Sequence, residues 1–151
     1  MKIPREVVDF IEERGLGKFG TIGYLSIVYD DRGVLKPLTS VRHFKLQDDS
    51  LIFADRFSNY LKQNLTKNKY VSVVFAEASR DAVGYQILGE AEYLESGPLF
   101  EEGLDAVRDL KIPAPLKGVV RIKVDSVRSL VAGENTANGY VTDEDYEEDY
   151  V

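Results

Sequence analysis

The apolar and polar positions between residues 50 and 95 follow strand and helix periods in one continuous unit. The spacing of Leu61 and Leu65 predicts a short amphipathic helix over residues 58–67. Ser58 is the expected N-cap of this helix, because its hydroxyl can accept a backbone N–H of the first turn. Apolar or alternating runs on either side predict strands at residues 50–54, 70–76 and 85–94. The last of these strands has a glycine near its middle, where a strand bends or a ligand comes close.

The rest of the chain supplies three more predicted strands and two more helices. Residues 30–33, Asp-Asp-Arg-Gly, have a turn composition and predict an antiparallel hairpin of residues 18–29 and 34–46. Alternation of valine and isoleucine with charged residues predicts a half-buried strand over residues 120–125. Proline at the start and glycine or an irregular segment at the end predict helices, from Pro4 to Gly15 and from Pro98 to Leu110.

Six strands with hairpin-length connections favour an antiparallel barrel over a doubly wound sheet, since parallel strands would require a helix between most of them. At 151 residues the chain has the length of one domain with its own core. The absence of cysteine excludes disulfides, thiolate metal ligands and a cysteine nucleophile. No apolar run approaches the roughly 20 residues of a membrane helix, and the N-terminus is charged throughout. We therefore expect a mainly β, cytoplasmic protein with no membrane partner.

The net charge of −7 is concentrated at the C-terminus. From Ser129 onward the chain has seven acids and no lysine or arginine, and removing these seven from the 26 acids leaves 19 acids against 19 bases. A neutral body offers no extended basic face, so nucleic acid is not an expected partner. The composition predicts a folded domain over residues 1–132 and an acidic tail over residues 133–151, solvated or used to dock a partner.

The turn into the predicted helix at residues 58–67 is a candidate anion site. The first-turn amides of a helix attract anions, and Arg56, Lys62 and Lys67 lie close by in sequence, so a phosphate would be stabilised there. His43 is the only histidine, which leaves no two-histidine metal site within one chain, and it is expected to be an ordinary strand residue. No metal site and no Gly-x-Ser-x-Gly elbow are indicated.

Between residues 3 and 132 the chain resembles a known family, through the order of the segments FAD, NYLKQNL, VSVVF and GYQILGEAEYL. This order is similar to that of the pyridoxamine 5'-phosphate oxidase-like FMN-binding split barrels, and most closely to their small bacterial FMN-binding members. The resemblance implies a six-stranded antiparallel split β-barrel of Greek-key order with short peripheral helices. It also implies FMN along one flank and a homodimer with the flavin site at the subunit interface.

The resemblance further implies which residues contact the cofactor. Positions that face the flavin on the second strand fall on Thr39, Ser40 and Arg42. The end of the third strand falls on Ala54 and Asp55, and the phosphate turn on Asn59, Tyr60, Leu61 and Lys62. Hydroxyl, amide and guanidinium groups are suitable donors for phosphate and for ring carbonyl oxygens. Without the resemblance, Thr39 and Ser40 would be read as ordinary strand residues and Arg42 as a surface charge.

The chain departs from the family at two places. The pair that is often Lys-Thr, or Arg-Lys in the oxidases, is Tyr60-Leu61 here, so at least one charge-assisted contact to phosphate is missing. Arg42, Arg56 or Lys62 could compensate, or the site could take the deazaflavin F420 in place of FMN. The Arg-Gln pair that the oxidases place before the long strand reads Val83-Gly84, which argues against pyridoxamine phosphate as the substrate.

Three functions remain open at this point. The first is an FMN-dependent oxidoreductase of unknown substrate, electron donor and acceptor, in which the flavin carries the redox chemistry. The second is a flavin or deazaflavin carrier with no substrate pocket of its own. The third is a barrel without cofactor that acts as an interaction module, for which the Tyr60-Leu61 pair and the acidic tail are the supporting features.

Overall fold

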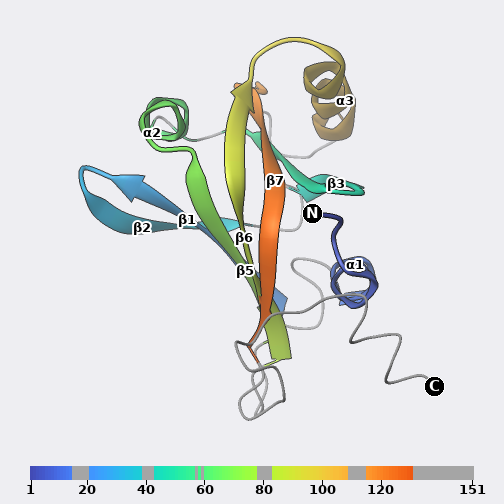
Figure 1. Cartoon of the computed structure of the whole chain (residues 1–151). Coiled ribbons are helices and arrows are strands. Elements are labelled where there is room, and N and C mark those ends of the chain that lie inside the picture. Colours follow the sequence, from blue (N-terminus) through green and yellow to red (C-terminus); the bar gives the residue numbers. More distant parts are fainter. Residues whose placement is uncertain are drawn as a thin grey trace, which may run out of the picture.

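The computed structural model describes residues 1–14, 21–38, 43–56, 58, 60–77, 83–108 and 115–130. The described strands form one antiparallel sheet in the order β2-β1-β5-β6-β7-β4-β3 (Figure 1). Their bounds are β1 Thr21–Tyr29, β2 Arg32–Leu38, β3 His43–Gln47, β4 Ser50–Asp55, β5 Tyr70–Glu77, β6 Val83–Leu94 and β7 Gly118–Ser129. The prediction of a mainly β protein with an antiparallel split-barrel sheet is confirmed.

The strand count is corrected from six to seven within the described residues. Residues 34–46 are not one strand, because β2 and β3 lie at opposite edges of the sheet and pair with β1 and β4 respectively. The two edges do not pair with each other in the described part of the chain. Only residues 39–42 connect β2 to β3, a span of at most about 19 Å at 3.8 Å per residue. The sheet must therefore curve until its edges approach at this end.

The β1–β2 hairpin is confirmed, and its turn is tighter than the composition suggested. Tyr29 pairs with Arg32, so Asp30 and Asp31 alone form the turn. Their φ angles are 52° and 61°. Positive φ at both central residues is the requirement of a type I′ turn, whose twist matches that of the flanking strands.

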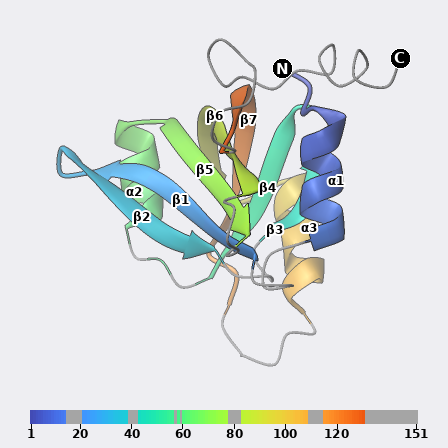
Figure 2. The same cartoon turned by 90° about the horizontal axis from the view of Figure 1, so that it is seen from below.

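Three helices lie around the described sheet: α1 Arg5–Arg14, α2 Leu61–Lys67 and α3 Pro98–Val107. All three were predicted, although α2 begins three residues later than expected and α3 ends before Leu110. In Figures 1 and 2, α2 lies on the side of the β1–β2 hairpin, and α1 and α3 lie on the opposite side. Helix α2 packs on β1 and β6, whereas α3 packs on β4 and β7. Thus α2 covers one end of the curved sheet.

The core is built from the inward face of each strand, where side chains alternate with outward ones. Leu25 of β1 pairs with Val73 of β5, Val73 with Ile87 of β6, and Ile87 with Val127 of β7. All four side chains are buried. The register between β6 and β7 shifts at Gly89, where a Cβ would overlap the backbone of β7. The mid-strand glycine of β6 is therefore a bend with a close backbone approach, one of the two alternatives expected from the sequence.

Candidate functional site

A buried carboxylate lies at the end of the barrel that α2 covers. Leu51, Phe53 and Asp55 alternate along β4 and pair with β7 at successive inward positions, the last of them opposite Gly118. Strand alternation therefore turns the Asp55 side chain into the barrel, and the residue is only 3% exposed. An ionised carboxylate in such a place requires hydrogen-bond donors, because its transfer out of water is costly.

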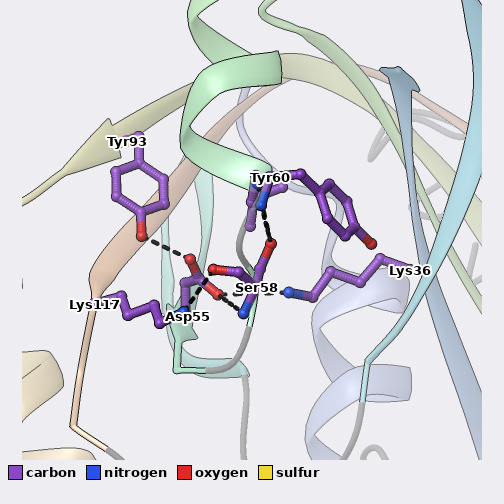
Figure 3. Close-up of polar contacts among 7 residues, drawn as sticks. Lys36, Asp55, Ser58, Tyr60, Tyr93 and Lys117 are labelled. Atoms are coloured by element: carbon purple, nitrogen blue, oxygen red, sulfur yellow. Dashed lines mark hydrogen bonds and ion pairs between the residues drawn. The ribbon is translucent and has the colours of Figure 1, made fainter. Parts of the chain in front are cut away.

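Donors from three parts of the chain converge on Asp55 (Figure 3). Tyr93 of β6 donates its hydroxyl to Oδ2 at 2.6 Å. The backbone N–H of Ser58 donates to Oδ1 at 3.2 Å, and Lys36 Nζ of β2 lies 3.5 Å from the same oxygen. The Lys36 side chain is itself only 14% exposed. The pair is therefore a largely buried ion pair completed by a phenol and an amide.

The Tyr93 ring packs directly on the backbone of Gly118 in β7. A Cβ at Gly118 would overlap the ring and hydroxyl of Tyr93, so only glycine leaves room for the phenol at this register position. Burial and the neighbouring Asp55 carboxylate both raise the pKa of Tyr93 above its ordinary value, with burial the larger cause. The phenol is therefore protonated at neutral pH and can donate to Asp55.

The described residues before α2 are held by hydrogen bonds to other groups of the protein. Ser58 Oγ accepts the backbone N–H of Leu61 at 3.0 Å and that of Tyr60 at 3.3 Å. The prediction of Ser58 as the N-cap is corrected: the helix begins at Leu61 and its N-cap is Tyr60, while the Ser58 hydroxyl accepts amides two and three residues further along the chain. Lys117 Nζ donates to the Ser58 carbonyl at 3.0 Å, and the Lys117 N–H donates to the Asp55 carbonyl at 2.8 Å. The described amides at residues 58, 60 and 61 thus all have acceptors within the protein.

The other predicted site residues that the structure describes have different surroundings. Ala54 and Leu61 are buried, and Leu61 belongs to the core. The Tyr60 ring packs edge-on against Tyr29, with 5.6 Å between centroids. Lys62 Nζ forms an exposed ion pair with Glu95 Oε1 at 2.6 Å. Four predicted residues lie outside the described part of the chain: Thr39, Ser40, Arg42 and Asn59.

The bases near the α2 turn are distributed differently from the sequence expectation. Arg56 is buried, with 6% of its surface exposed. Lys67, in the last turn of α2, lines an open hollow of about 330 Å³ between the helix and the β1–β2 turn. Asp30, Asp31 and the side-chain amides of α2 also line this hollow, which gives it a mixed polar surface. Two further bases contact the turn: Lys36 pairs with the Asp55 carboxylate and Lys117 donates to the Ser58 carbonyl.

Sequence reasoning missed Lys36, Tyr93 and Lys117. Lys36 falls between Val34 and Leu38 at a spacing of two, so strand alternation alone would have placed it on the inward face. The same period places Tyr93 inward, two residues after Ala91, which pairs with the buried Ile122. Their meeting with Asp55 depends on the sheet order, because β4 reaches β6 only through β7. No local pattern carries that information.

Comparison with solved structures finds the same fold in several bacterial proteins. HupZ of Group A Streptococcus is 20% identical, with 89% of this chain and 99% of that chain covered and a TM-score of 0.71. An FMN-binding protein from Syntrophomonas wolfei is 16% identical, with 85% and 86% covered and a TM-score of 0.66. General Stress Protein 26 from Bacillus anthracis is 20% identical, with 85% and 93% covered and a TM-score of 0.61. At these identities the likeness establishes the fold.

Sequence comparisons place the chain more narrowly. A search of curated proteins gave no match. None of the helices in the described part of the chain is long and apolar enough to cross a membrane. The family model for pyridoxamine 5'-phosphate oxidase matches residues 3–130, which include every described helix and strand. The chain therefore belongs to the pyridoxamine 5'-phosphate oxidase family.

Proposed function

We propose that this chain is a flavin-binding protein and that the flavin gives it an oxidoreductase function. The observation that carries the proposal is the family match over residues 3–130, on a chain whose described strands form one seven-stranded antiparallel sheet. The FMN-binding protein from Syntrophomonas wolfei, which shares the fold, supports the same ligand class. A bound flavin would supply the electron transfer, and the protein would supply binding and orientation. FMN and a deazaflavin are both candidates for the cofactor.

At the start of α2, the described amides of Ser58, Tyr60 and Leu61 already have acceptors within the protein. Ser58 Oγ accepts the amides of Tyr60 and Leu61, and Asp55 accepts the amide of Ser58. A phosphate needs hydrogen-bond donors, whereas the amide of Ser58 already donates to an anion of the protein, the Asp55 carboxylate. Helix α2 has only seven residues, so its dipole adds little to attract an anion. We therefore assign no step of the proposed chemistry to a phosphate at this turn.

We further propose that the protein is a homodimer in which two copies enclose the flavin. The outward face of β1, β2 and β5 carries Ser26 and Ser72 together with five apolar or aromatic side chains, here called the outer patch: Tyr24, Val28, Leu35, Pro37 and Val74. Leu35 is 63% exposed and Val28 is 37% exposed. Apolar side chains gathered on one face of a sheet are typical of a surface that a partner covers. A second copy of the chain is the partner that the family relationship favours.

The experiment that tests the proposed function is the visible spectrum of the protein purified without added cofactor. Flavin absorption bands, with release of the same chromophore on heat denaturation, are the expected result. Chromatography of the released compound against FMN, riboflavin and a deazaflavin standard then identifies it. A colourless protein that also fails to bind any of the three in titrations would contradict the proposal.

A barrel without cofactor is the second candidate, and one observation favours it. The predicted contact residue Leu61 is a core residue, and Asp55 is satisfied by donors of the protein itself. The described groups of the turn thus have hydrogen-bond partners within the protein. Under this alternative the outer patch would serve an interaction partner, and the protein would show neither colour nor flavin binding.

A further inference from the structure

The open hollow between α2 and the β1–β2 turn has the size of a small-molecule site and a polar lining. Its volume is about 330 Å³, within the usual range of roughly 300–1,000 Å³ for such sites. Most of its lining side chains carry a carboxylate, a carboxamide or an ammonium group: Asp30, Asp31, Gln63, Asn64, Lys67 and Asn68. Because small-molecule pockets are more often lined by apolar groups, this hollow favours a polar ligand.

Asn64 presents a buried hydrogen-bond acceptor at this hollow. The residue is only 7% exposed. Its Nδ2 donates to the Tyr60 carbonyl at 2.7 Å, and since a carbonyl oxygen can only accept, the other end of the carboxamide is the oxygen Oδ1. Within the described part of the chain, no group donates to Asn64 Oδ1. A buried acceptor that lacks a donor is costly, so a donor that enters the hollow would be stabilised there.

The charged groups of the hollow add up to a net negative charge. Asp30 and Asp31 supply two carboxylates and Lys67 one ammonium, which leaves a charge of −1. Among the described residues, none of the three forms an ion pair. Tyr29 also lines the hollow and is 43% exposed, and the face of an aromatic ring attracts cations. A ligand that satisfies these groups is therefore a hydrogen-bond donor with positive charge.

We propose that the hollow between α2 and the β1–β2 turn binds an organic amine of the polyamine class. An ammonium group has three N–H donors and no acceptor, so one such group can donate to a carboxylate and to Asn64 Oδ1 together. A divalent metal ion suits the hollow less well. Such an ion needs about six oxygen ligands, whereas no group of three or more acidic, histidine or cysteine residues is found in the described part of the chain. The proposal is independent of the proposed flavin function.

The test is an NMR titration of the isotope-labelled protein with putrescine, a diamine, and with butane-1,4-diol, which has the same carbon chain without the charges. We expect saturable shifts of the Asn64 side-chain amide and of the Asp30 and Asp31 backbone amides with putrescine, and none with the diol.

A double variant, Asp30→Asn with Asp31→Asn, removes both charges and keeps a residue type that tolerates the positive φ of this turn. We expect its affinity for putrescine to be at least about fivefold lower, because two charge pairs are lost. The matched control is Asp125→Asn, which removes an exposed carboxylate from β7 and is expected to leave the affinity unchanged.

Several results would overturn the proposal. One is the absence of saturable shifts at tens of millimolar putrescine. Another is a set of shifts confined to residues 143–149, which would mean that the acidic tail alone holds the amine. Equal binding of the diol, or an unchanged affinity in the folded double variant, would overturn it as well. If the double variant does not fold, the positions of the shifts in the wild-type protein decide.

Discussion

At Asp55 a single side chain collects hydrogen bonds from β6 and from the segment before α2, together with an ion pair from β2. Such a cluster stabilises the fold only as a complete set, because each buried polar group depends on the others for its partners. Loss of one member exposes the desolvation cost of the rest. Single substitutions within the cluster should therefore have larger effects than their individual hydrogen bonds suggest.

Tyr93→Phe removes the phenol hydroxyl that donates to Asp55 at 2.6 Å and keeps the ring that packs on Gly118. We expect the free energy of unfolding to fall by about 1–3 kcal/mol, because a buried charged acceptor loses a donor. Urea unfolding measures the change. Tyr70→Phe is the control, since Tyr70 is 61% exposed and should change the stability by less than about 0.5 kcal/mol. Equal effects of the two substitutions would contradict the prediction.

The raised pKa of Tyr93 also predicts a dependence of stability on alkaline pH. In the unfolded chain the phenol ionises near its ordinary pKa of about 10, while in the folded protein burial keeps it protonated to higher pH. Its contribution is therefore complete below about pH 10 and is lost as the pH rises above that value. The difference in unfolding free energy between wild type and Tyr93→Phe should shrink from pH 9 to pH 11. A constant difference would refute this assignment.

At the scale of one element, α2 shows how a short helix depends on its ends. Its seven residues lie below the length at which a helix is stable by itself. Leu61 and Leu65 bury one side of it in the core, and Ser58 Oγ binds two amides at its start. The Asn64 side chain adds a hydrogen bond from Nδ2 to the Tyr60 carbonyl at 2.7 Å. Burial of one side and these local hydrogen bonds thus stabilise a helix that is too short to be stable by itself.

Ser58→Ala removes the acceptor for the Tyr60 and Leu61 amides. The expected loss of unfolding free energy is about 1 kcal/mol, similar to the loss of a hydroxyl that accepts an amide at the start of a helix. Relative to the wild-type protein, hydrogen exchange in the variant should become faster in the first turn of α2 and should change less in β5. Ser58→Thr keeps the hydroxyl and should retain most of the stability. If threonine is as destabilising as alanine, the hydroxyl is not the group that matters.

At the scale of the whole molecule, the outward face of the sheet has two regions: one on β4 and β7 that a helix covers, and one on β1, β2 and β5 that carries exposed apolar side chains. Helix α3 packs on β4 and β7, and the outward Ile52 of β4 is fully buried. The outer patch on β1, β2 and β5 carries apolar residues, of which Leu35 is 63% exposed and Val28 is 37% exposed. A homodimer through the outer patch would cover these side chains and would create a site that one copy lacks.

Leu35→Glu tests the proposed dimer by placing a charge in the outer patch, where Leu35 is 63% exposed. We expect light scattering to give twice the chain mass of 17.0 kDa for the wild-type protein and the single mass for the variant. The stability of the isolated chain should change little. Leu104→Glu is the matched control, because Leu104 is 38% exposed on α3, away from the patch, and should leave the dimer intact. A wild-type protein with the single mass at micromolar concentration would refute the dimer.

The sequence predicted the local elements better than their arrangement. Alternation and turn composition were sufficient for the β1–β2 hairpin, since its turn, Asp30–Asp31, joins residues adjacent in the chain. The break between β2 and β3 was missed because residues 34–46 have the same apolar pattern whether they form one strand or two strands at opposite edges of the sheet. For the site, Asp55 was identified through the resemblance, whereas Lys36 and Tyr93 approach it through pairings with strands distant in sequence. The pairing of distant strands depends on how the whole sheet buries its apolar side chains, and a short stretch of sequence does not contain that information.

The position of β4 in the sheet has a consequence for folding. β4 joins the main sheet only through β7, and Ser50 pairs with Lys123 near the end of the described chain. All six β4 residues are buried in the final structure. During synthesis the β3–β4 hairpin therefore leaves the ribosome long before the strand that covers its edge. Pairings this distant in sequence slow folding and lengthen the time for which an apolar strand edge is open to other chains. The β4 edge is therefore paired only once residues 118–129 have been synthesised and have joined the sheet.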